Sequence, residues 1–139
     1  MTFADDDSPK AEPGSAKQDQ RHLKRVALMQ ELFAFSFFTD KDQPARLSLQ
    51  PDKPSLIKPL VLQLPQIDAI IQQHAPERPL TEINQVDLAI LRVIVWESLH
   101  KNTPRKVLID EGVELAKTFG SESSPRFVNG VLGKLMIIN

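Results

Sequence analysis

The stretch that most constrains the fold is residues 85–101, QVDLAILRVIVWESLHK, where apolar side chains fall on every side of a helix. The apolar positions are Leu88, Ala89, Ile90, Leu91, Val93, Ile94, Val95, Trp96 and Leu99. A helix that is hydrophobic all round is normally buried on all sides. This segment is also too short and too charged to cross a membrane. We therefore expect a helical domain in which this segment is the central helix.

Polar residues of the same helix require partners. Asn84 can cap its start, and Asp87 favours the positive end of the helix dipole. Arg92 and Glu97 interrupt the apolar run, but their spacing does not place them opposite each other. Because buried charges need counter-charges, we expect Arg92 to find a carboxylate on another helix and to form a structural ion pair.

The composition fits one domain preceded by a tail. The 139 residues are 41% hydrophobic, which is enough for a real core, and they include no cysteine. Residues 1–18 are rich in Asp, Pro, Ser and Lys and carry almost nothing apolar after Phe3, so we predict a disordered N-terminal tail. Residues 19–139 are predicted to form a single helical domain. No signal peptide or membrane span is visible.

The first predicted helix, residues 19–38, carries two different faces. The predicted core stripe consists of Leu23, Val26, Ala27, Gln30, Phe33, Ala34 and Phe37. The opposite face holds Arg21, Lys24 and Arg25 in its first half and Leu28, Leu32 and Phe35 in its second. The basic run is most simply a solvated face. The apolar half is covered either by the rest of the fold or by a partner.

The middle of the chain is interrupted by prolines. Residues 39–55 lack a period and are predicted to be a loop, and residues 75–81 a connector. Residues 56–73 have a helical pattern, but Pro65 cannot lie inside a regular helix. Either the helix kinks there, or two short helices meet and the second begins at Pro65 or just after it.

Two further helices are predicted near the C-terminus. One spans 104–119, started by Thr103 and Pro104 and ended by a left-handed Gly120. The other follows Ser124 and Pro125 and spans 126–137. The predicted core residues are Leu108, Gly112, Leu115, Ala116 and Phe119 on the first and Val128, Val131, Leu132 and Leu135 on the second. We expect Gly130 to mark a close approach of another helix.

The residues show no pattern typical of catalysis. His22, His74 and His100 are scattered without the spacing of metal ligands. Glu111 and Glu114 share a helix face, where carboxylates are usually solvent-facing or paired with a lysine such as Lys117. No nucleophile with a neighbouring base can be proposed. We therefore expect a binding protein rather than an enzyme, with no cofactor and no metal.

Residues 107–135, VLIDEGVELAKTFGSESSPRFVNGVLGKL, closely resemble the NusB transcription antitermination family. The family pattern is V-x-I-N-E-A-V-E-L-A-K-x-F-G, a short loop, and F-V-N-G-V-L, which 127–132 match without change. VDLAILRVIVWE is similar to the family's central helix, and RHLKRVALMQELF to its first. The chain departs from the pattern at Asp110, Gly112, Gly133, Phe33 and Trp96, and has His22 and Leu23 where arginines are frequent. The family segment matching 40–55 is longer.

The resemblance implies an all-α NusB-like helical bundle with a buried central helix, shortened in its N-terminal half. It also implies an RNA-binding transcription antitermination factor in the cytoplasm. Such a factor binds boxA-type single-stranded RNA together with ribosomal protein NusE and acts on the transcription elongation complex during ribosomal RNA synthesis. The implied RNA-binding residues are Arg21, His22, Lys24, Arg25, Lys117, Phe119, Arg126, Phe127 and Asn129. By motif, Phe33 and Asp87 correspond to the NusE contact.

Separate roles are expected within this set. Arg21, Lys24 and Arg25 offer phosphate contacts, and Phe119 and Phe127, on either side of the loop 120–125, offer stacking faces for bases. Each aromatic residue can equally be a core residue that anchors a helix end. Asn129 can read a base edge or cap backbone.

Two alternatives remain open at this point. The first is a NusB-like protein-interaction module with weak RNA affinity. The second is the N-terminal RNA-binding domain of an RNA cytosine methyltransferase. Because 139 residues leave no room for a catalytic domain, the second alternative applies only if this sequence is a piece of a longer protein.

Overall fold

In the computed structural model the described residues, 13–37 and 55–138, form helices joined by short connections, and no strand occurs among them. The helices are α1 (Pro13–Phe35), α3 (Lys58–Val61), α4 (Leu64–His74), the 3-10 helix η1 (Leu80–Glu82), α5 (Gln85–His100), α6 (Arg105–Phe119) and α7 (Ser124–Ile138). The all-α prediction is confirmed. The predicted loop at 39–55 lies almost entirely outside the described residues, as does the predicted shortening of the N-terminal half.

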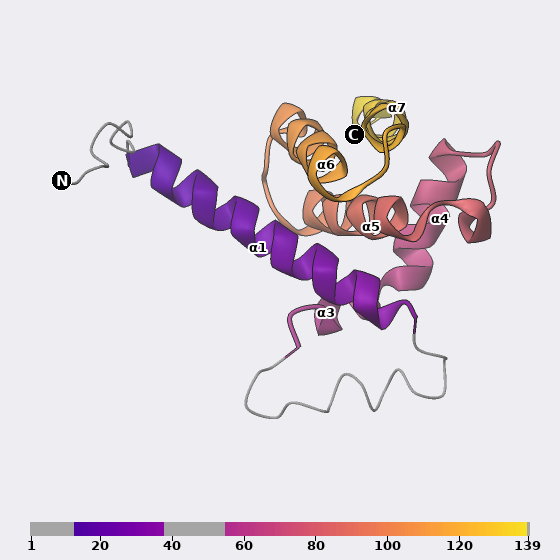
Figure 1. Ribbon diagram of the computed structural model, residues 1–139, viewed down its shortest axis with the longest axis horizontal. Helices are drawn as coiled ribbons and strands as arrows, with labels where there is room; N and C mark the ends of the chain where they lie inside the picture. The colour runs from indigo at the N-terminus through magenta and orange to yellow at the C-terminus, as the bar shows by residue number, and fades with distance from the viewer. Residues whose placement is uncertain (1–12, 38–54, 139) are drawn as a thin grey trace.

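Helix α5 is the centre of the bundle, as predicted. It contacts α1, α4, α6 and α7. Figure 1 shows α1 crossing on one side of α5 and α6 and α7 stacked on the other. Every residue from Asp87 to Leu91 and from Val93 to Val95 is buried. Leu99, in the last turn, is 41% exposed, so the prediction of burial is wrong for that residue.

The polar residues of α5 are paired largely as expected. The Asn84 side-chain oxygen accepts hydrogen bonds from the backbone N–H groups of Val86 at 2.8 Å and Asp87 at 3.4 Å. Arg92 donates from Nε to Asp68 Oδ1 at 2.8 Å and from Nη2 to Asp68 Oδ2 at 2.9 Å. Asp68 lies on α4, so the predicted ion pair with another helix is confirmed. Its two-pronged geometry fixes α4 against α5.

The predicted core face of α1 is wrong. The helix buries Arg25 and Met29 together with Leu32 and Phe35, so the alternative in which the rest of the fold covers the apolar half of the opposite face is confirmed for the last two. Leu23, placed in the core stripe, is 64% exposed, and Phe37 just after the helix is 63% exposed. The sequence has two apolar faces on this helix, and Arg25 on one of them indicated that this face is exposed. The face is buried because carboxylates from other helices compensate the Arg25 charge.

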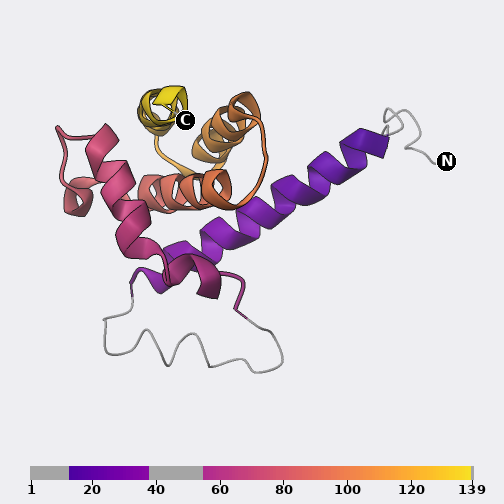
Figure 2. The same ribbon diagram turned by 180° about the vertical axis from the view of Figure 1, so that it is seen from behind.

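Helix α1 also begins earlier than predicted, at Pro13. Residues 13–18 of the predicted tail are drawn into this helix, and residues 1–12 lie outside the described part. Figures 1 and 2 both show the first turns of α1 projecting beyond the other helices. The buried residues of α1, from Arg25 to Phe35, lie in its second half.

The prolines divide the segment after residue 55 as one alternative proposed. Helix α3 ends at Val61 and α4 begins at Leu64, with Pro59 and Pro65 each in a first turn. A proline in a first turn loses no intrahelical hydrogen bond, because the first N–H groups have no partner in the helix. The break lets Leu60 of α3 and Ile67 and Ile71 of α4 all be buried.

Helices α6 and α7 bury the predicted stripes, except that Phe119 is half-buried. The glycine predictions are wrong. Gly130 has open space where a Cβ would stand, whereas a Cβ on Gly112 would lie 2.5 Å from Leu132 Cδ1. The close approach of α6 to α7 is therefore at Gly112. Gly120 is extended (φ −92°, ψ −168°) rather than left-handed. It is needed because a Cβ there would lie 2.5 Å from Ser124.

Replacing Ile94 by Ala is expected to lower the free energy of unfolding by about 2–5 kcal/mol, because the side chain is fully buried in a packed core. Leu62→Ala is the control, since Leu62 is 75% exposed and its loss should change stability by less than about 0.5 kcal/mol. Chemical denaturation of both variants measures the difference. Equal effects would show that α5 is not the centre of the core.

Candidate functional site

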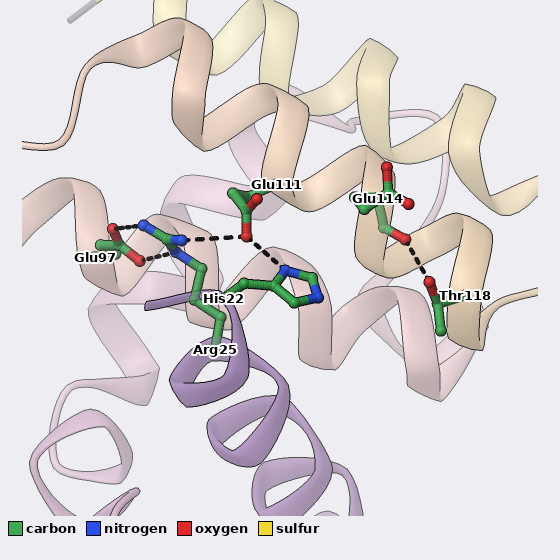
Figure 3. Close-up of polar contacts among 6 residues, drawn as sticks. All are labelled: His22, Arg25, Glu97, Glu111, Glu114 and Thr118. Carbon is green, nitrogen blue, oxygen red and sulfur yellow. Dashed lines mark hydrogen bonds and ion pairs between the residues drawn. The ribbon is translucent and has the colours of Figure 1, made fainter. Parts of the chain in front are cut away.

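A buried ion-pair cluster joins α1 to α5 and α6. Arg25 donates from Nε to Glu97 Oε1 and from Nη2 to Glu97 Oε2, both at 2.8 Å. Its Nη1 donates to Glu111 Oε1 at 3.1 Å. Figure 3 shows the guanidinium between the two carboxylates, one from each helix. Arg25 is 6% exposed, so this cluster is part of the structural interior.

Glu97 keeps its charge at neutral pH. Burial by itself raises the pKa of Glu97, but hydrogen bonds from Arg25 and Thr103 and the charges of Arg25 and Lys101 lower it below its usual value. The Thr103 hydroxyl donates to Glu97 Oε2 at 2.6 Å. Thr103 was predicted to cap the next helix, which instead begins at Arg105 with Pro104 at the cap position and no side-chain cap. Its hydroxyl completes the environment of Glu97.

At the outer edge of the cluster lies His22. Its Nδ1 is 2.9 Å from Glu111 Oε1, and the His22 side chain is 34% exposed. The prediction that Glu111 faces solvent or a lysine is wrong, because the residue binds Arg25 and His22. Glu114 does remain exposed, and its backbone carbonyl accepts a hydrogen bond from the Thr118 hydroxyl (Figure 3). The contacts of Glu111 hold α1 against α6.

The predicted basic face of α1 is therefore divided. Arg21 and Lys24 are exposed, and His22 is half-buried. The prediction that Arg25 shares this exposed face is wrong, because its side chain turns inward to the two carboxylates. A phosphate could reach the guanidinium only in competition with Glu97 or Glu111. Of the basic residues predicted on this face of α1, Arg21 and Lys24 therefore remain exposed.

Three of the five predicted RNA-binding residues on α6 and α7 line one depression. An open depression of about 580 Å³ runs between these helices. Its lining consists of Asp110, Val113, Glu114, Lys117, Pro125, Arg126 and Asn129. Lys117, Arg126 and Asn129, which the resemblance implied as RNA-binding residues, therefore share one groove, which we call the α6–α7 groove. It presents two cations and an amide, with two carboxylates among the other lining residues.

The two predicted aromatic residues flank the loop at the end of this groove. Phe119 and Phe127 are half-buried and pack against the core. The guanidinium carbon of Arg78 lies 4.8 Å from the centroid of the Phe127 ring. The loop between them is held by Ser124, whose hydroxyl oxygen accepts from the Ser121 N–H at 2.9 Å. Both readings of these aromatic residues, as core anchors and as surfaces for bases, remain compatible with half burial.

The two predicted partner residues lie in different settings. Asp87 is 4% exposed, and its Oδ1 is buried without a hydrogen-bond partner. Burial raises the pKa of Asp87, against the opposing effects of a hydrogen bond from Ser124 and the charge of Arg78. Phe33 is half-buried at the end of α1, with its ring edge-on to Phe37 at a centroid distance of 4.9 Å. The structure shows no contact that joins these two residues.

Sequence reasoning missed three contributors to this region. Glu97 and Glu111 were not recognised as the partners of Arg25, and Arg78 was not associated with Phe127. Each contact joins residues far apart in the chain, so no local spacing could indicate it. The only available signal was that an unusually apolar helix contained a glutamate, which had to find a cation somewhere.

Other kinds of site find no support in the described ranges. Residues 13–37 and 55–138 contain no group of three or more His, Cys, Asp or Glu side chains arranged to hold a metal ion. Within the same ranges no helix is long and apolar enough to cross a membrane.

Comparison with known proteins gives consistent matches. Residues 22–136 match the sequence model of the NusB family. The chain is 38% identical over 130 residues to the transcription antitermination protein NusB of Chloroflexus aggregans, covering 84% of this chain and 87% of that protein. It is 48% identical over 73 residues to NusB of Roseiflexus sp. (strain RS-1), and this match spans about half of that relative, 51%. The solved structure of T. maritima NusB is similar with a TM-score of 0.67 and 27% identity, covering 84% of this chain and 90% of that one.

Replacing Arg25 by Ala is expected to lower the free energy of unfolding by about 3–5 kcal/mol, because it leaves the Glu97 charge buried without its main partner. Arg21→Ala removes the same charge from an exposed position and should cost less than about 0.5 kcal/mol. Denaturant titrations at neutral pH compare the two.

The same variants have a predicted pH dependence. The pKa of Glu97 in the folded chain lies below its ordinary value of 4.5, so the unfolded chain binds more protons between these two pKa values. The stability that Glu97 contributes is therefore complete above pH 4.5 and is lost as the pH falls through the lowered folded pKa. Arg25→Ala should remove this contribution. If the stability of Arg25→Ala falls below pH 4.5 as it does in the unchanged chain, Arg25 is not what lowers the pKa of Glu97.

Proposed function

The chain belongs to the NusB family of transcription antitermination proteins, and we propose that it acts by binding boxA-type single-stranded RNA together with ribosomal protein NusE. The observation that carries the RNA half is the α6–α7 groove, which gathers Lys117, Arg126 and Asn129 beside the loop flanked by Phe119 and Phe127. This role belongs to the cytoplasm, during ribosomal RNA synthesis on the transcription elongation complex, and requires binding without catalysis.

Cations on two helices would bind the RNA backbone. Lys117 and Arg126 are exposed at the groove, and Arg21 and Lys24 are exposed on α1. The contact of His22 with Glu111 brings this part of α1 to α6, one helical turn from Glu114 in the groove lining. A phosphate chain could therefore follow the groove and continue onto α1. Such contacts provide affinity and position without reading sequence.

Base recognition would come from the aromatic residues and Asn129. Unpaired bases bind proteins by stacking on aromatic rings and by hydrogen bonds to their edges. Asn129 is exposed in the groove and has both a donor and an acceptor to offer. Phe119 and Phe127 retain exposed ring area while their other sides pack on the core. The core contacts hold the rings in place, which reduces the entropy lost on binding.

For the NusE half, the aromatic pair at the end of α1 is the stronger feature. Phe37 is 63% exposed and lies edge-on to Phe33. Exposed aromatic side chains of this kind commonly anchor protein interfaces. Asp87 is nearly buried, so it could contact NusE directly only through the small part of its side chain that is exposed. Its charge could also affect NusE binding indirectly, through the segments that contact Asp87.

A second candidate function is a protein-interaction module with weak RNA affinity. The burial of Arg25 favours it, because that burial removes one cation from the face that would bind phosphates. The carboxylates of Asp110 and Glu114 in the groove act in the same direction. RNA titration separates the two candidates.

Changing Lys117 and Arg126 together to Ala is expected to weaken binding of a boxA-like RNA and to reduce the salt slope by about two units at most, because two phosphate contacts are lost. Lys58→Ala is the control, since Lys58 is exposed on α3, away from the groove. Titrations at several salt concentrations give the slopes. If the control lowers affinity as much as the groove variants, or if the unchanged chain binds no RNA, the RNA proposal is wrong.

Phe37→Ala is expected to weaken NusE association with little loss of stability, because most of the side chain is already exposed. Asp87→Asn keeps the shape and removes the charge, so it tests whether the carboxylate contributes to the partner surface. Binding kinetics and melting are measured on the same samples, with Leu62→Ala as an exposed apolar control. Unchanged kinetics for both variants would contradict this placement of the partner surface.

A further inference from the structure

An exposed arginine outside the family motif lies directly on the aromatic residue that begins FVNGVL. The Arg78 guanidinium carbon is 4.8 Å from the centroid of the Phe127 ring, within the range of a cation–π contact. Arg78 comes from the connection between α4 and η1, whereas Phe127 is in the first turn of α7. The contact therefore joins two segments at the end of the molecule where the α6–α7 loop lies.

The backbone that carries Arg78 is held in place. Gln72 Nε2 donates to the carbonyl oxygens of Ala75 at 3.0 Å and Arg78 at 2.9 Å. The Leu80 N–H donates to Gln72 Oε1 at 3.1 Å. One buttressing side chain thus ties the connection at three points, and Pro76 and Pro79 further restrict it. Arg78 therefore lies on a backbone segment that hydrogen bonds and prolines hold in place.

The surroundings of Arg78 leave its charge available to a ligand. The residue is exposed, and its charge acts on the nearly buried Asp87, whose Oδ1 has no hydrogen-bond partner. Arg78 has five N–H donors, and its planar guanidinium can contact a ring with one face while its edge binds an oxyanion. This geometry suits a nucleotide, which offers a base and a phosphate together.

We propose that Arg78 is an RNA-binding residue of this chain, which with Phe127 forms one composite site for a nucleotide of single-stranded RNA. The Phe127 ring and the guanidinium that lies over it together form the surface for the base, and the N–H groups at the edge of the guanidinium bind the adjoining phosphate. The proposal rests on the RNA-binding function proposed above and adds a residue that the groove does not include. Gln72 is a positioning residue, because it acts on the RNA only by holding the Arg78 backbone.

The test measures RNA affinity for Arg78→Ala, Arg78→Lys and Phe127→Leu, each with a melting curve. Arg78→Ala is expected to weaken binding of a boxA-like RNA about tenfold and to reduce the salt slope by about one unit. Arg78→Lys should keep the slope but lose part of the affinity, since lysine lacks the planar fork. Phe127→Leu preserves apolar volume in the half-buried position and removes the ring. Lys58→Ala again serves as the control.

A double variant tests whether the two residues form one site. Combined with Phe127→Leu, Arg78→Ala should cost clearly less than it does alone, because the nucleotide has already lost its place on the ring. Equal or tighter RNA binding by Arg78→Ala would overturn the inference, since the arginine would then be only a cover over the ring. Strictly multiplicative losses would overturn the composite site.

The groove variants distinguish this failure from a failure of the proposed function. If Lys117→Ala and Arg126→Ala weaken RNA binding while Arg78→Ala does not, only the inference is wrong. If the unchanged chain binds no boxA-like RNA, both are wrong. A fall in the melting temperature of Arg78→Ala without a change in affinity of the folded protein would assign the residue a structural role and overturn the inference.

Discussion

The structure depends on the burial of α5 on all of its sides. A helix in that position must bring its own charged residues into the interior, where each needs a counter-charge close by. Arg92 receives Asp68 from α4, and Glu97 receives Arg25 from α1. These ion pairs therefore decide which faces of α4 and α1 turn toward the centre, while the surrounding apolar side chains supply most of the stabilisation.

The Glu97 pair has a consequence for the surface. Because Arg25 is drawn inward, α1 packs with Met29, Leu32 and Phe35 beneath it, and Leu23 and Phe37 are left exposed. The same contact extends to Glu111 and His22, which fixes the middle of α1 against α6. A residue that resembles a phosphate ligand in sequence thus serves to place the residues around it. Arg21 and Lys24 remain outside.

A second group of contacts organises the opposite end of α5. Asp87 is close to Ser124 and to the charge of Arg78, and Arg78 lies over Phe127. The start of α5, the connection before η1 and the start of α7 are therefore linked by polar and cation–π interactions. Arg78 thus acts on both residues, on Asp87 through its charge and on Phe127 by lying over its ring.

The sequence by itself determined the central helix, its Asn84 cap, an interruption near Pro65 (a kink or a break) and the buried stripes of α6 and α7, because these follow from local periodicity and backbone chemistry. The resemblance carried by residues 107–135 likewise indicated the family and, with it, the candidate RNA-binding residues Lys117, Arg126 and Asn129. Only the tertiary structure decided the face of α1, the burial of Asp87, the close approach at Gly112 and the pairing of Arg78 with Phe127. Each of these depends on a charge or a volume supplied by a distant segment, and periodicity within one helix carries no information about what another helix brings to it.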